Sequence, residues 1–309
     1  MRQGEVAPRG KWTGQASGGV SAPDPLILPD PAKRFADAAE RLEALAAGHP
    51  MEAWLRFMAR LAEAQHTAAT TLPPLSSVEL ASLAQAVEAR LPPIAAETHR
   101  RESAWQDGLA TILDDMADAS VPDAARRVAT ALRQRSPQDV ESLAEAFLDS
   151  RVPADRVGEA LYVAAALQVY FTRLAASLPT GALRLLPQRG LCPCCGSTPV
   201  TGLVTASGRT PGTRYLTCSL CATAWNHVRA VCITCGGSRR VSLKCIEGGS
   251  SAIKAEACDD CHTYAKMLYQ AEDTKVNAFA DDLATLALDV LVAEAGWARH
   301  APNPMLMMQ

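Results

Sequence analysis

Apolar residues recur at helical spacing through the N-terminal part of the chain. In the segment 54–61 they fall on one face, with charged residues on the other, which is typical of an amphipathic α-helix. Ser136 and Pro137 form an N-cap and first-turn signal ahead of another such stripe. The segment 160–171 is apolar nearly all round, as expected for a helix at the centre of a bundle. These patterns predict six to eight helices between about residues 25 and 180.

The pattern changes near Leu185. All ten cysteines lie between Cys192 and Cys261, and none precedes them. Beyond them, apolar residues recur at intervals of four, three, four and seven: Phe279, Leu283, Leu286, Val290 and Trp297. This spacing predicts one amphipathic C-terminal helix that packs back on the protein, followed by a short Met-rich tail.

These shifts predict an α+β fold with an N-terminal helical domain, two tandem rubredoxin-like or zinc-ribbon four-cysteine modules, and a C-terminal helix. The Gly-, Ser- and Pro-containing start of the chain predicts a disordered tail. The expected division is a tail over 1–24, helices over 25–184, modules over 185–226 and 227–272, and a C-terminal helix and tail over 273–309.

Eight of the cysteines form four Cys-x-x-Cys pairs, whose spacing lets two thiolates of one tight turn reach a single ion. The pairs repeat at a fixed interval, because 232−192, 235−195, 258−218 and 261−221 all equal 40. Gly196 and Gly236 repeat in the same way, so the module is an internal duplication. The repeat predicts two four-cysteine metal sites. The first is Cys192, Cys195, Cys218 and Cys221, and the second is Cys232, Cys235, Cys258 and Cys261.

The repeat leaves two cysteines without a metal role. Cys194 corresponds to Thr234 in the second copy, so we expect a structurally indifferent residue, with a reactive thiol as the alternative. Cys245 alternates with Val241 and Leu243 on an expected strand, which favours a small buried residue.

The metal is either zinc or iron. Zinc is the usual ion of a closed site of four thiolates. However, Cys192-Pro-Cys-Cys195-Gly196 is also the Cys-Pro-x-Cys-Gly turn of iron-binding rubredoxins, and tetrahedral all-sulfur geometry suits both ions.

The charge of the chain bears on whether it binds nucleic acid or a membrane. The net charge is −3 over 309 residues, which gives no argument for a nucleic-acid or membrane partner. Residues 185–272 carry nine basic and five acidic residues, an excess of four positive charges, which eight thiolates with two divalent ions would balance. No secretion signal or membrane-spanning run is apparent, so we expect a cytoplasmic protein with reduced cysteines.

The remaining polar residues predict no active site. His227 and His262 are expected at the surface or beside the metal sites, and Trp225 in the core. The pair Asp281-Asp282 is expected on a solvated helix face. Sites with four protein ligands also lack the open position that metal catalysis needs, so we predict that the protein is not an enzyme.

The chain resembles the FdhE-type formate dehydrogenase accessory proteins. The resemblance rests on "CPCCGSTPV", "RYLTCSLCATAWNHVRAVCITCG", "IKAEACDDCHTYAKMLYQ" and "ADDLATLALDVL", and covers the chain from Leu191 to near the C-terminus. It implies a cytoplasmic maturation factor that binds the catalytic subunit of a respiratory formate dehydrogenase. It also implies rubredoxin-type iron at the two sites. Cys194 departs from the family pattern, which usually has another residue there.

Two other functions stay open at this point. One is a zinc ribbon that binds nucleic acid, although the charge count argues against it. The other is a thiol-exchange or sulfur-transfer protein that uses Cys194 or a Cys-x-x-Cys pair.

Overall fold

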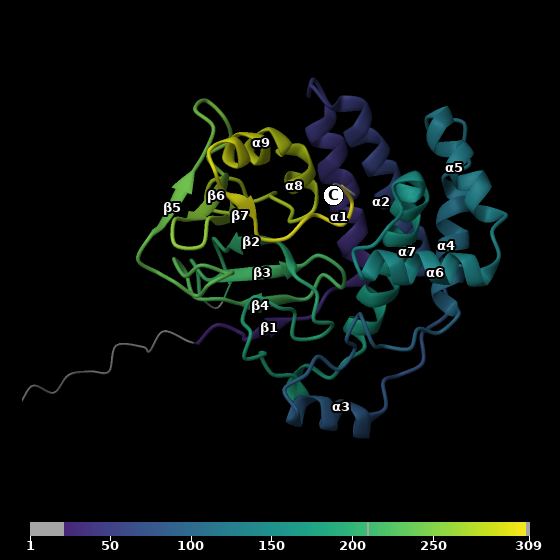
Figure 1. The fold of residues 1–309 in the computed structure, drawn as a ribbon, viewed down its shortest axis with the longest axis horizontal. Helices are drawn as coiled ribbons and strands as arrows, with labels where there is room; N and C mark the ends of the chain where they lie inside the picture. Colours follow the sequence, from purple (N-terminus) through teal and green to yellow (C-terminus); the bar gives the residue numbers. More distant parts are fainter. Residues whose placement is uncertain (1–21, 209, 307–309) are drawn as a thin grey trace, which may run out of the picture.

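A computed structural model describes residues 22–208 and 210–306 of the chain. Helices gather on one side of the molecule and a twisted sheet lies on the other, with the C-terminal helices packed over the sheet (Figure 1). The prediction of a mixed α+β class is confirmed. Most of the expected disordered tail, residues 1–24, lies outside the described residues, but Asp24 accepts a hydrogen bond from the hydroxyl of Tyr215 at 3.0 Å.

Between residues 22 and 184 of the described chain there are seven α-helices, in agreement with the six to eight that the hydrophobic pattern predicts. They are α1 (Pro31–Ala46), α2 (Glu52–Thr71), α3 (Leu80–Glu88), α4 (Ala104–Asp115), α5 (Asp123–Arg133), α6 (Pro137–Leu148) and α7 (Val157–Ala176). Two 3-10 turns, η1 (Ala154–Arg156) and η2 (Thr180–Ala182), flank α7. Ser136 caps α6 as expected, because its hydroxyl accepts the Asp139 N–H at 3.2 Å. Over the described ranges, no helix is both long enough and apolar enough to cross a membrane.

Helix α7 is the centre of the bundle. Its buried residues extend from Ala160 to Ala175 around the whole circumference, and it packs against α1, α2, α4, α5 and α6. A buried polar chain connects this helix to the first cysteine module. Gln65 donates to Gln168 at 3.1 Å, and Gln168 donates to the Ser219 carbonyl at 2.8 Å. The helices therefore hold the first module through satisfied buried hydrogen bonds as well as apolar packing.

The sheet combines both copies of the duplication. Its strands are β1 (Leu26–Ile27), β2 (Pro199–Val204), β3 (Arg214–Cys218), β4 (Ala224–Asn226), β5 (Val241–Lys244), β6 (Ile253–Cys258), β7 (Thr263–Tyr269) and β8 (Ala298–Arg299). Their order is β1-β4-β3-β2-β7-β6-β5, with β8 beside β7. Strands β2, β3 and β4 of the first copy correspond to β5, β6 and β7 of the second. The parallel pairing of β2 with β7 joins the copies into one sheet.

The register of the strands repeats with the sequence. Tyr215 pairs with Asn226 in the first copy, and Ala255 pairs with Lys266 in the second. The two pairs are equivalent in the repeat, since 255−215 and 266−226 both equal 40. The duplication that the cysteines indicate therefore extends to the backbone pairing.

The C-terminal helical segment is divided, not continuous as predicted. Helix α8 covers Ala280–Ala284 and helix α9 covers Leu286–Glu294, with a break at Thr285. The Thr285 hydroxyl donates to the Asp281 carbonyl at 2.7 Å and accepts from Lys266 Nζ at 3.0 Å. Lys266 also donates to the main-chain carbonyl of Thr285 at 3.2 Å. The break thus exposes the carbonyl and hydroxyl of Thr285 to the buried Lys266 ammonium, which donates hydrogen bonds to both.

The prediction that Asp281 and Asp282 are solvated is wrong. Their exposed fractions are 1% and 0%. Arg41 pairs with Asp281 at 2.7 Å, and Lys266 pairs with Asp282 at 3.2 Å. Arg299 adds a second cation to Asp282 at 2.5 Å. Buried carboxylates are stable only with such compensation, so this cluster attaches α8 to α1, β7 and β8.

The C-terminal tail packs on the protein as far as residue 306, where the described chain ends. Residues 298–299 form β8, and Asn303 donates to Asp282 at 2.5 Å with only 2% of its surface exposed. Met305 is buried as well. This packing cannot be predicted from local sequence patterns, because the residues that the tail contacts are distant along the chain.

Candidate metal centres

Each centre is built from two tight turns, one that precedes the first strand of its copy and one that connects the second strand to the third. In the first turn of each copy, the N–H of Gly196 or Gly236 donates to the carbonyl of the cysteine four residues earlier. Both glycines have a positive φ, 78° and 74°, a conformation that costs glycine little. The second turns place Ala222 and His262 at φ 59° and 53°. The four turns therefore repeat in conformation as well as in sequence.

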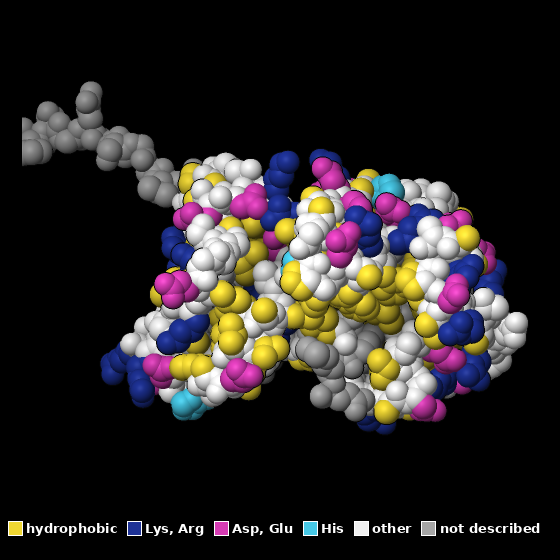
Figure 2. Space-filling model, turned by 90° about the horizontal axis from the view of Figure 1, so that it is seen from above, with side chains coloured by type: hydrophobic (Ala, Val, Ile, Leu, Met, Phe, Trp, Pro, Cys, Tyr) yellow, Lys and Arg dark blue, Asp and Glu magenta, His cyan; other side chains and the backbone are white. Residues whose placement is uncertain are grey.

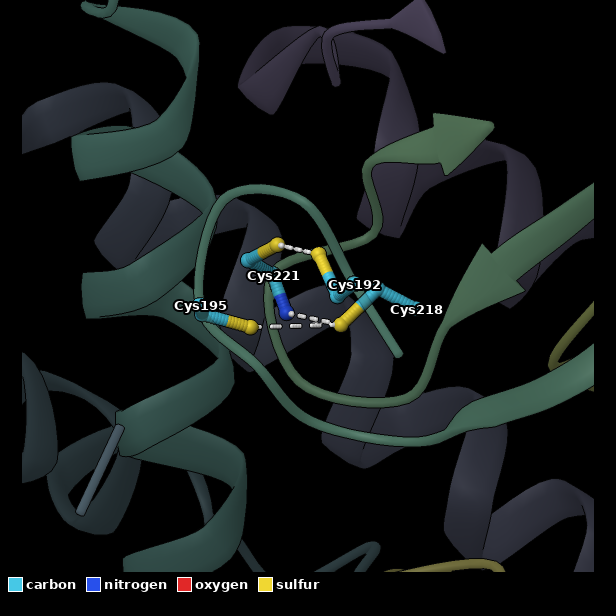
Figure 3. A group of neighbouring side chains, drawn as sticks. All are labelled: Cys192, Cys195, Cys218 and Cys221. Carbon is cyan, nitrogen blue, oxygen red and sulfur yellow. Dashed lines mark hydrogen bonds between the residues drawn. The ribbon is translucent and has the colours of Figure 1, made fainter. Parts of the chain in front are cut away.

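The first centre brings together Cys192, Cys195, Cys218 and Cys221, as predicted. Their side chains converge from two loops that face each other beside α7 (Figure 3). The sulfur atoms of Cys192 and Cys221 are 3.5 Å apart, and those of Cys195 and Cys218 are 3.4 Å apart. The N–H groups of Leu220 and Cys221 both donate to the Cys218 sulfur at 3.4 Å.

The second centre has the same arrangement, again from the predicted residues. The Cys232 and Cys261 sulfurs are 3.6 Å apart, and the Cys235 and Cys258 sulfurs are 3.8 Å apart. A threonine hydroxyl lies near the last sulfur of each set, Thr223 at 3.2 Å and Thr263 at 3.1 Å.

These distances fit a tetrahedral ion. With metal–sulfur bonds of roughly 2.3 Å, tetrahedral geometry separates neighbouring sulfurs by about 3.8 Å. Within each set, all four sulfurs lie within 4.8 Å of one another. Each set could therefore hold one ion. The identity of the ion does not follow from the geometry, because zinc and iron share it.

Buried thiolates in the first centre would require a compensating positive charge. Burial raises the pKa of the Cys192 and Cys221 thiols well above the usual value, whereas burial at Cys195 is outweighed by hydrogen bonds from the neighbouring cysteines, which lower its pKa. Metal binding requires the thiolate form of each ligand, and buried thiolates are stable only beside positive charge. Arg34 supplies part of it. Its guanidinium lies 3.2 Å from the centroid of the Phe279 ring, and burial lowers its pKa to about 9 while the charge of Cys218 opposes that shift.

The two centres differ sharply in exposure. All four cysteines of the first set are buried, whereas Cys235 is exposed and Cys261 is half-buried. The cover over the first centre is the segment 92–96 of the helical domain. Ile94 donates its N–H to the Cys194 carbonyl at 3.0 Å, and Ala96 donates to the Cys195 carbonyl at 2.8 Å.

Of the two cysteines outside the groups of four, Cys194 and Cys245, one does not lie where the sequence predicts. Cys194 is fully buried under Ile94, so it belongs to the packed core between the helices and the first turn. Cys245 is exposed, which contradicts the prediction of a buried residue. Strand β5 ends at Lys244 and is the edge strand of the sheet, so the alternation that predicts burial stops short of Cys245.

The neighbouring aromatic residues have structural roles. Trp225 is 1% exposed and donates to the Arg189 carbonyl at 2.8 Å, which confirms core packing. His227 is 5% exposed, so it does not lie at the surface. Burial, followed by the charge of Arg214, lowers the pKa of His227 to about 4.

A groove of about 1150 Å³ runs beside the first centre, between the helical domain and the C-terminal segment. Phe147, Leu148, Val152 and Leu220 contribute to its apolar lining, and Glu97 and Arg151 carry opposite charges along it. Figure 2 shows a face on which apolar side chains gather in a hollow and charges of both signs are interspersed. That face carries no continuous basic stripe of the kind that follows a phosphate backbone.

Family models, related sequences and a solved structure all match this chain to the same family. Family models match in three consecutive parts, described as FdhE, N-terminal, over residues 23–187, FdhE, central domain, over 191–229, and FdhE, C-terminal domain, over 230–306. A Protein FdhE homolog of Edwardsiella ictaluri is 40% identical over 292 residues, 94% of each chain. Protein FdhE of Escherichia coli is 37% identical over 284 residues, 91% of each chain. The crystal structure of the FdhE protein from Pseudomonas aeruginosa superposes with a TM-score of 0.81 at 34% identity, and covers 91% of this chain and 98% of that one.

Proposed function

This chain belongs to the FdhE family, and we propose that it is an accessory protein of a respiratory formate dehydrogenase. It binds the catalytic subunit of that enzyme in the cytoplasm and is needed for the assembly or activity of the enzyme. This client follows from the resemblance of the cysteine segments and the C-terminal helices to the FdhE type.

We also propose that the eight paired cysteines hold two metal ions, with iron favoured. Cys192, Cys195, Cys218 and Cys221 are the ligands of one ion, and Cys232, Cys235, Cys258 and Cys261 are the ligands of the other. The Cys-Pro-x-Cys-Gly turn at residues 192–196 supports iron. An ion in such a site cross-links four chain positions, and iron also adds a one-electron redox couple.

The observation that carries the non-enzymatic role is the closed geometry of both centres. Four sulfurs from the chain surround each ion position at tetrahedral spacing, so no coordination position is left for a substrate. We infer that the eight cysteine ligands have a structural role. When they bind two ions, they fix the conformation of the four turns next to the strands.

The thiol-exchange alternative has little support from the site. Cys194 has no exposed surface, while a nucleophilic thiol needs access to its target. The exposed Cys245 belongs to neither group of four cysteines. It is also not part of a Cys-x-x-Cys pair, because residues 242 and 248 are Ser and Gly.

A binding measurement with purified components tests the proposal. The metal-loaded full chain should bind the catalytic subunit of formate dehydrogenase, and should oxidise no formate by itself. The Cys218→Ser variant should bind more weakly, because three thiolates leave the first centre incomplete. Tight binding to duplex DNA without binding to the catalytic subunit would contradict the proposed class.

A further inference from the structure

The duplication allows the two centres to be compared position by position. In the first copy, the carbonyl groups of Cys194 and Cys195 point at the helical domain and accept the N–H groups of Ile94 and Ala96. The corresponding carbonyls of the second copy belong to Thr234 and Cys235, since 234−194 and 235−195 both equal 40. In the described part of the chain, no hydrogen-bond donor reaches either of these two carbonyls.

The glycine after each pair shows the same contrast. A side-chain carbon on Gly196 would meet Pro92 at 3.2 Å, so the covering segment lies directly on this residue. A side-chain carbon on Gly236 would meet nothing within 4 Å. Thr234, Cys235 and Gly236 are all exposed. The second copy thus presents, uncovered, the backbone surface that the first copy uses to bind a chain segment.

The first copy also shows what kind of segment fits this surface. Residues 92–96 read Pro-Pro-Ile-Ala-Ala and carry no charge. They supply two N–H groups two residues apart, and Ile94 is fully buried in the contact. Asp259 and Asp260 already lie between the ligands Cys258 and Cys261, so a further carboxylate on the bound segment would add like charge beside the thiolates.

We propose that the turn Cys232–Gly237 is a docking site for the client protein, and that it binds an uncharged, apolar segment of the client chain. That segment donates two main-chain N–H groups, two residues apart, to the carbonyls of Thr234 and Cys235 and lies against Gly236. The inference rests on the proposed function, because it takes the formate dehydrogenase subunit as the source of the segment.

The test uses two matched substitutions in the metal-loaded full chain. Gly236→Asn places a side chain where the client segment would lie, and asparagine tolerates a positive φ better than most residues. Gly248→Asn is the control, because Gly248 has the same φ of 74° and also faces open space. Gly248 lies in the β5–β6 turn, at the opposite end of those strands from the second centre.

We expect both variants to keep two metal ions and Gly236→Asn alone to bind the client about tenfold more weakly or worse, as the loss of two hydrogen bonds implies. Equal client affinity for the two variants would overturn the inference and leave the proposed function standing. Failure of the unsubstituted protein to bind the client would instead remove the proposed function. Weaker self-association of Gly236→Asn with unchanged client binding would assign the site to a second copy and also overturn the inference.

A second measurement needs no substitution. Hydrogen–deuterium exchange of the wild-type complex should show slower exchange over residues 234–240 than in the free protein. A client segment should also show two newly protected amides two residues apart. Unchanged exchange over 234–240 in a fully formed complex would contradict the docking site, even where Gly236→Asn fails to retain its metal.

Discussion

Lys266 and Asp282 form an ion pair in which neither side chain is exposed, with 3.2 Å between Lys266 Nζ and Asp282 Oδ1. Lys266 also lies 2.6 Å from Asp289, and Arg299 pairs with Asp282. These contacts connect the second copy of the duplication, through β7, to the C-terminal helices.

Removal of the buried lysine should therefore destabilise the protein strongly. Lys266→Met removes one of the two cations, Lys266 and Arg299, that pair with the buried carboxylates of Asp282 and Asp289. One negative charge is then uncompensated, and we expect a loss of about 3–5 kcal/mol in the free energy of unfolding. Arg56→Ala is the control, because it breaks an exposed pair with Glu52 at 2.8 Å and should cost less than about 1 kcal/mol. Urea unfolding of the metal-loaded proteins measures both values. Similar losses for the two variants would show that the buried cluster is dispensable.

The two centres should release their metals at different rates. The second centre should lose its ion to a chelator first, because Cys235 is exposed while all cysteines of the first centre are buried. Release followed by a chromogenic chelator should show two phases. Cys258→Ser should remove the fast phase, and Cys218→Ser the slow one. A single phase, or loss of the fast phase in Cys218→Ser, would be incompatible with this assignment.

The two spare cysteines should differ in reactivity and neither should affect metal content. In the metal-loaded protein, a thiol reagent should label the exposed Cys245 and leave the buried Cys194 unlabelled until unfolding. Cys194→Ala and Cys245→Ser should each retain two ions by elemental analysis. Rapid labelling of Cys194 would instead favour a thiol-based activity.

The stability of the protein should depend on pH through His227. Its pKa is lowered from 6.5 to about 4 by burial and then by the charge of Arg214. Between these pH values the unfolded chain binds a proton that the folded chain does not bind, so the free energy of unfolding falls as the pH drops from 6.5 towards 4. The contribution is at most on the order of 3 kcal/mol, and solvent screening reduces it.

The control for this pH dependence is His227→Gln, which removes the titrating group. Unfolding of both metal-loaded proteins at matched pH values between 4 and 7 isolates the histidine from any acid release of metal. The variant should show a shallower dependence than the wild type. Identical slopes would mean that His227 titrates equally in the folded and unfolded chains.

The sequence predicts well which cysteines come together in two groups of four, because Cys-x-x-Cys spacing is a local property and the interval of 40 checks the pairing independently. It fails where partners come from distant elements. Asp281 resembles a solvated helix residue until Arg41, 240 positions earlier, is brought against it. Cys245 resembles a strand interior until β5 proves to be the edge of the sheet. The cover of Ile94 over Cys194 has no local signal either.

The most direct test of the central claim is the formate dehydrogenase activity of a strain that lacks this gene. The account predicts that the deletion abolishes activity of the respiratory enzyme, that the wild-type gene restores it, and that Cys218→Ser, expressed at an equal level, restores it poorly. Full formate dehydrogenase activity in the deletion strain would contradict the account.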